Sequence, residues 1–67
     1  MSDQLLKIPE VADRLRVSRA FVYELMNAGA LGSIHIGGAR RVAESQLDDY
    51  IARLIQEDRE RRKDQHG

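Results

Sequence analysis

The chain has 67 residues, no cysteine and a formal net charge of zero, so we expect one small domain that depends on its apolar core. A chain of this size buries only about 60% of the surface that its unfolded state exposes, and without cysteine no disulfide or thiolate metal site reinforces it. No segment approaches the roughly 20 apolar residues of a membrane-spanning helix, and the polar start of the chain lacks the pattern of an export signal. These features favour a bacterial cytoplasmic protein that makes no contact with a membrane.

The charges are unevenly distributed along the chain. Residues 1–43 hold six basic and four acidic side chains, whereas residues 44–67 hold five basic and seven acidic ones. Nucleic-acid-binding proteins usually carry a basic excess, which the whole chain lacks. Because the acidic surplus lies in the last third, the first two thirds can still present a basic face.

The first predicted element is a short helix from Pro9 to Leu15. Proline is favoured at the first helical position, where its missing N–H would have no partner, and Glu10 suits the positive end of the helix dipole. Val11 and Ala12 join Leu15 on one apolar face at helical spacing.

A second helix is predicted from Arg19 to Ala28. Ser18 is a suitable N-cap, because its hydroxyl can accept a hydrogen bond from a free backbone N–H. Gly29 is a suitable stop, because glycine adopts the left-handed backbone conformation at the lowest cost. The inner face of this helix is apolar: Val22, Leu25 and Met26. Since the predicted helices are so close in the chain, the sequence indicates a tight helix–turn–helix.

The third piece predicts a β-hairpin. Gly37-Gly38 is a strong two-residue turn signal, since the favoured hairpin turns need positive φ, and the return strand runs from Ala39 to Ala43. Before the turn, apolar and polar residues alternate, which predicts that Ile34 and Ile36 point inward with Leu31, while Ser33 and His35 point outward.

A last helix is predicted from Glu44 or Ser45 onward, with one apolar stripe at helical spacing: Leu47, Tyr50, Ile51, Leu54 and Ile55. From Gln56 the run QEDRERRKDQHG has no apolar residue; it extends the helix into solvent and is expected to fray or be disordered. We therefore predict a domain over residues 5–55 and a charged, frayed tail over residues 56–67.

The order helix, helix, hairpin, helix predicts a mainly α fold with a small β-hairpin, a winged helix-turn-helix. Apolar residues stand where two crossing helices must bury against each other: Val11, Leu15, Val17, Val22 and Leu25. Ala12 is small, as a close helix crossing requires. The alternative interpretation is a helical hairpin with no role on DNA.

If the unit docks as such motifs do, its second helix enters the major groove of double-stranded DNA with its N-terminus first. Six side chains then point outward: Ser18, Arg19, Ala20, Tyr23, Glu24 and Asn27. Arg19 suits guanine or a phosphate, Asn27 suits adenine or a phosphate, and Ala20 suits a thymine methyl group. The hydroxyls of Ser18 and Tyr23 suit phosphate oxygens.

Several of these residues have a second interpretation. Glu24 accepts from cytosine or, as we favour, pairs with a nearby arginine. Tyr23 contacts DNA or packs half-buried, and Phe21 is expected in the core against the wing or the last helix. Arg14 and Arg16 flank the turn and either touch the DNA backbone or are solvated.

The predicted wing carries Arg40 and Arg41 just after the glycine turn. Arginines on a projecting hairpin suit a phosphate backbone or a narrow minor groove; the alternative is two solvated charges. Gly38 and His35 complete the predicted wing contacts, although His35 is more often an ordinary exposed strand residue.

The run LLKIPEVADRLRVSRAFVYELMNAGALGSIHIGGARRV resembles the excisionase-type branch of the MerR-like winged helix-turn-helix domains, and the similarity continues through ESQLDDYIARL, over residues 5–54. The resemblance implies a phage or mobile-element recombination directionality factor. Such proteins bind repeated sites in attachment DNA, often side by side, bend the DNA and direct an integrase toward excision, without catalysis. Family contacts fall on Ser18, Arg19, Ala20, Tyr23, Arg40 and Arg41. Phe21 and Ala39 depart from the family pattern, which favours a small hydroxyl residue and a further basic residue there.

Two other functions stay open from the residues. One is a small transcriptional regulator, a repressor or activator, that uses the same domain. The other is an interaction module whose basic tail residues, Arg59, Arg61, Arg62 and Lys63, bind DNA or an integrase, unless neighbouring Glu57, Asp58, Glu60 and Asp64 make them a solvated helix end. The sequence has no nucleophile–base pair, phosphate loop or metal cluster, so we expect neither an enzyme nor a cofactor.

Overall fold

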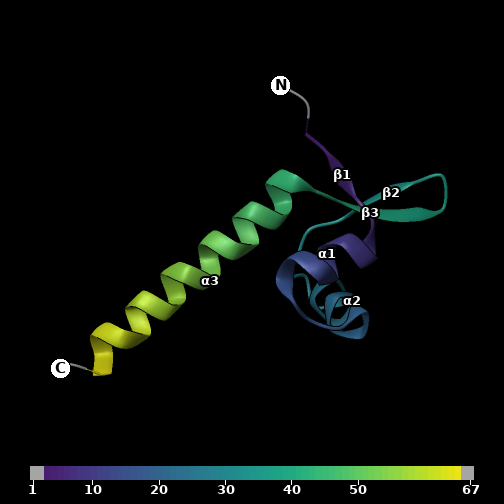
Figure 1. Ribbon diagram of the computed structural model, residues 1–67. Coiled ribbons are helices and arrows are strands. Elements are labelled where there is room, and N and C mark those ends of the chain that lie inside the picture. Colours follow the sequence, from purple (N-terminus) through teal and green to yellow (C-terminus); the bar gives the residue numbers. More distant parts are fainter. Residues whose placement is uncertain (1–2, 66–67) are drawn as a thin grey trace.

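The chain forms two short helices, a three-stranded antiparallel sheet and a long last helix (Figure 1). The computed structural model describes residues 3–65. The elements are β1 (Leu5–Leu6), α1 (Ile8–Leu15), α2 (Arg19–Asn27), β2 (Ile34–Ile36), β3 (Ala39–Ala43) and α3 (Glu44–Gln65). The predicted winged helix-turn-helix, mainly α with a small hairpin, is confirmed.

Both helices of the helix–turn–helix begin at caps. At α1, which starts one residue before the predicted Pro9, the backbone N–H of Lys7 donates to the Glu10 carboxylate at 2.9 Å. At α2 the hydroxyl of Ser18 accepts from the backbone N–H of Phe21 at 3.2 Å. Ser18 is therefore the N-cap that the sequence predicts.

Both helices also end in a left-handed residue. Gly29, with φ of 77°, follows α2, and Ala30 N–H then donates back to the Leu25 carbonyl at 2.9 Å. This Schellman arrangement satisfies carbonyls that the helix end leaves free, and it confirms the predicted glycine stop. At α1 the equivalent residue is Arg16, with φ of 59°, where a side chain makes the left-handed conformation cost about 1–2 kcal/mol.

The wing is the hairpin of β2 and β3. Gly37 and Gly38 both have positive φ, 54° and 86°, as a type I′ turn requires, which confirms the predicted turn. The strand pairing places Ile34 opposite Arg41 and His35 opposite Arg40.

The two-residue strand β1 was not predicted. Leu5 pairs with Ala43 and Leu6 with Val42, which makes β3 the central strand. A strand of two residues is too short to show an alternating pattern, so the sequence gives no local signal for it.

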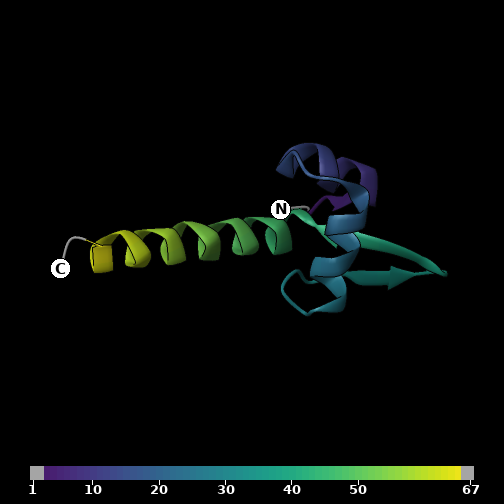
Figure 2. The same ribbon diagram turned by 90° about the horizontal axis from the view of Figure 1, so that it is seen from below.

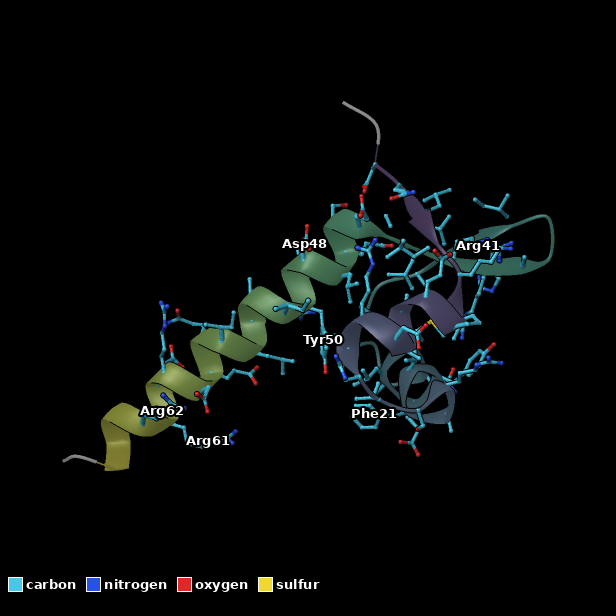
Figure 3. The ribbon with its side chains drawn as sticks, viewed as in Figure 1. Phe21, Arg41, Asp48, Tyr50, Arg61 and Arg62 are labelled. Carbon is cyan, nitrogen blue, oxygen red and sulfur yellow. The ribbon has the colours of Figure 1, made fainter. Side chains whose placement is uncertain are left out.

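The core lies where the helix pair, the sheet and the start of α3 meet. Its largest fully buried side chains come from five elements and one loop: Leu6, Val11, Val22, Leu31, Val42 and Leu47. Tyr50 also joins this cluster, and Figure 3 shows it pointing from α3 toward the helix pair. β2 contributes no buried residue, so the wing projects beyond the core.

The start of α3 is capped by the beginning of the chain. Ala43, the residue before α3, has no side-chain acceptor, and Asp3 supplies one: its carboxylate accepts from the backbone N–H of Ser45 at 3.1 Å and from the Ser45 hydroxyl. These hydrogen bonds lower the pKa of Asp3 below its ordinary value of 3.8. The Gln46 side chain completes the cap by accepting from Ala43 N–H at 3.0 Å.

Beyond its first two turns α3 leaves the domain (Figures 1 and 2). Leu54 and Ile55 are 43% and 49% exposed, so the prediction that the whole apolar stripe closes the core is wrong for these two residues. Both residues lie beyond the surface of the domain against which the start of α3 packs. It continues to Gln65 without a break at residue 56, as the predicted extension into solvent implied, while the division into domain and frayed tail stays a prediction.

The predicted orientation of the wing strands is also wrong. Ile34 and Ile36 are 38% and 47% exposed, because they share the outer face of the sheet with Arg41 and Leu5. The inner face is fixed by buried Leu6 and Val42, and alternation along β3 then assigns Arg40 and its partner His35 to that inner side.

Phe21 was expected in the core, and that prediction is wrong: it is 42% exposed on α2 (Figure 3). Its neighbour Val22 is fully buried, and successive helical residues are turned by about 100° from one another. Val22 and Met26 thus take the inward face and leave Phe21 at its edge.

Candidate nucleic-acid interface

The outer face of α2 is open to solvent. All six residues predicted to face DNA are exposed: Ser18, Arg19, Ala20, Tyr23, Glu24 and Asn27. Val22 and Met26 anchor the opposite face in the core, which fixes the rotation of the helix. A rigid helix with an open polar face has the form needed to enter the major groove of B-DNA.

The structure bears on two residues of this face. Tyr23 is 45% exposed, so part of its ring is accessible, and its contact with DNA stays a prediction. The ion pair favoured for Glu24 does not form among the residues that the structure describes. Both side chains are free to approach a ligand.

The wing presents its two arginines on opposite faces of the sheet. Arg40 and His35 lie on the side of the helix pair, whereas Arg41 lies on the outer side with Ile34. Gly38 sits in the turn at the tip. The two arginines of the wing therefore have different neighbours.

Arg40 also contacts α2 directly. Its Nη1 donates to Oδ1 of Asn27, the last residue of α2, at 3.5 Å. Arg41 Nη1 turns back to the Arg40 carbonyl at 2.9 Å. The contact between Arg40 and Asn27 was not predicted, because the residues around the glycine turn place Arg40 on the wing but do not indicate which face of the hairpin it occupies.

The two arginines that flank the turn have different surroundings. Arg14 Nη1 lies 3.0 Å from Glu44 Oε2 at the start of α3, so it ties α1 to α3. Arg16 is exposed in its left-handed position between the helices. Of the two, Arg16 is the more available to a DNA backbone.

The distribution of charge in space explains how a chain of zero net charge can present a basic face. Arg16, Arg19 and Arg40 lie on or beside α2, with Glu24 as the acidic residue on its outer face. Most of the acidic surplus lies on α3, and Figure 3 shows Asp48 on the side of α3 away from the helix pair. In the part of the chain that the structure describes, no helix is long and apolar enough to cross a membrane.

The fold and this open, basic face define a winged helix-turn-helix protein. The chain belongs to the family described as "Helix-turn-helix domain", which matches residues 5–54, and within it to the excisionase-type proteins. It is 45% identical over 51 residues to "Excisionase" from Streptomyces ambofaciens, an alignment that covers 76% of this chain and 82% of that protein. It is 41% identical over 51 residues to "Probable excisionase" from Saccharopolyspora erythraea, covering 76% of this chain and 52% of that protein. No solved structure matches the chain.

Proposed function

We propose that the protein is an excisionase: a non-catalytic factor that binds double-stranded attachment-site DNA, bends it and directs an integrase toward excision. The observation that carries the proposal is the 45% identity to a relative named excisionase, 82% of whose length is aligned. The exposed outer face of α2 on a winged helix-turn-helix supplies a means of binding DNA. On its sequence motifs we also assign the chain to the MerR-like branch and to a phage or mobile element.

The proposed docking has α2 in the major groove and the wing on the backbone or in the minor groove. Ser18 and Arg19 lie at the leading end of α2, followed by Ala20, Tyr23 and Glu24. Arg16 reaches the backbone beside the turn. Gly38 at the tip lets the wing backbone approach DNA closely, and Arg41 meets a phosphate from the outer side of the wing.

The projecting half of α3 is the proposed contact with the integrase. It carries the exposed Leu54 and Ile55, which border a groove with Leu15 and Ile51. Exposed apolar residues rimmed by charge are a common feature of protein-binding surfaces. We further propose that copies bind side by side on repeated sites, since one copy with zero net charge has little long-range attraction to DNA.

An excision assay with purified protein tests the proposal. The cognate integrase is incubated with a plasmid that carries both attachment junctions, with and without the protein, and excised circles are counted. We expect excision to require the protein and to be lost in Arg19→Ala. A control is Lys7→Ala, which removes one exposed positive charge between β1 and α1, outside α2, the wing and α3.

A gel-shift assay with permuted probes measures bending on the same DNA. Binding to a promoter with no effect on excision would overturn the proposal in favour of a small transcriptional regulator. Excision that Arg19→Ala leaves unchanged would overturn the proposed role of α2.

A further inference from the structure

Asn27 is held by a residue of the wing. Arg40 Nη1 donates to Asn27 Oδ1 at 3.5 Å. Arg40 is itself half-buried, and its Nε atom is buried without a hydrogen-bond partner among the described residues. Nε of Arg40 is therefore covered, while Nη1 reaches the exposed end of α2.

This contact changes what Asn27 can recognise. An asparagine side chain has one carbonyl oxygen, an acceptor, and one amide group with two donors. Recognition of adenine in the major groove uses both, because the oxygen accepts from adenine N6 and the amide donates to N7. Arg40 takes one of the two lone pairs of Oδ1, and an adenine amino group that approached the other would lie beside a donor that carries a full positive charge. The Asn27 amide remains free to donate.

We propose that Arg40 is a positioning residue of the DNA-reading surface, which joins the wing to the end of α2 and holds Asn27 as a hydrogen-bond donor. In this state Asn27 contacts acceptors, such as a phosphate oxygen or guanine N7 and O6, and does not read adenine. Arg40 thus acts through Asn27, in contrast to Arg41, which occupies the opposite face of the wing. The inference rests on the proposed binding of double-stranded DNA.

The neighbouring arginines provide a matched pair of variants. Arg40→Gln and Arg41→Gln remove the same charge from adjacent positions of β3, but only the first removes the contact with Asn27. Each variant, the wild type and Asn27→Ala are used to select duplexes from a library with a randomised central segment. The affinity of each protein for the duplex that wild type selects is then measured over a range of salt concentrations.

Arg40→Gln is expected to free Asn27 Oδ1 and raise the relative affinity for adenine at one position by about fivefold or more. Its salt dependence should match that of wild type, because no phosphate contact is lost. Arg41→Gln should keep the wild-type base preference and reduce the slope of log affinity against log salt by about one. In an Asn27→Ala background, Arg40→Gln should no longer alter base preference.

An unchanged base preference in Arg40→Gln, with a slope reduced by about one, would overturn the proposal and make Arg40 a direct phosphate contact. If circular dichroism shows that Arg40→Gln does not fold, Asn27→Ala decides alone, because Asn27 lies exposed at the end of α2. A variant with both the base preference and the DNA affinity of wild type would then overturn the proposal. A wild-type protein that enriches no sequence would refute the proposed DNA binding itself, and this role with it.

Discussion

Ser18 has two roles that substitution can separate. Its hydroxyl caps α2 by accepting from Phe21 N–H at 3.2 Å, and it stands at the end of the helix that we expect to meet DNA first. Loss of an N-cap costs about 0.5–2 kcal/mol. Because the Phe21 N–H is exposed, water can satisfy it in Ser18→Ala, so we expect a cost near the middle, about 1 kcal/mol. In a domain of this size that lowers Tm by roughly 4–8 °C.

Ser18→Asp is the informative partner of Ser18→Ala. Aspartate caps helices as well as serine does and favours the positive end of the dipole, so its Tm should equal or exceed that of wild type. Its charge would face phosphates, however, and two like charges about 4 Å apart at a protein surface repel by up to about 4 kcal/mol. We expect DNA affinity to fall at least about tenfold while the fold is retained.

Thermal unfolding by circular dichroism and DNA binding by fluorescence anisotropy measure the two effects. Unchanged stability in Ser18→Ala would mean that the hydroxyl does not stabilise α2 in solution. Full DNA affinity in Ser18→Asp would refute the placement of the α2 N-terminus beside the duplex.

Three further predictions concern stability. Arg16→Gly should raise the free energy of unfolding by about 1 kcal/mol in a urea titration, because glycine relieves the left-handed strain; a loss of stability would contradict that backbone conformation. Asp3→Ala should be less stable than wild type at pH 7, and the two should converge as pH falls through the lowered pKa of Asp3, since protonation then removes the same capping contacts; parallel stability curves from pH 7 to pH 2 would exclude that role. Replacing Leu54 and Ile55 together with serine should change stability by no more than about 0.5 kcal/mol, whereas Leu47→Ala, at a fully buried position, should cost about 2–5 kcal/mol; similar losses would show that the outer part of α3 packs on the domain.

The sequence predicted those features that arise from local backbone chemistry. Ser18 caps α2, Gly29 ends it, and the Gly37-Gly38 turn closes the wing, and each of these depends on a few consecutive residues. The exposed face of α2 was also predictable, since burying Val22 and Met26 settles which way the other side chains point.

Features that depend on distant parts of the chain were not predictable in the same way. Alternation in the wing defines two faces but does not say which one meets the core. Ile34 and Ile36 lie on the outer face because the strand register places them on the side opposite buried Val42. Leu54 continues the apolar stripe of α3 after the packing partner has ended. The contact between Arg40 and Asn27 requires both the strand register and the position of the helix.

The pairing of β1 with β3 and the capping of α3 by Asp3 affect the order in which the domain folds. Asp3 and Ser45 are 42 positions apart, and Leu6 enters the core only when it pairs with Val42. On the ribosome, the helix-turn-helix segment emerges before β3 and α3. The apolar core of the domain is therefore complete only after β3 and α3 have also emerged. Closing such a long loop is a slow, non-local event. We therefore expect folding to be all-or-none, with no stable intermediate that consists of α1 and α2 alone.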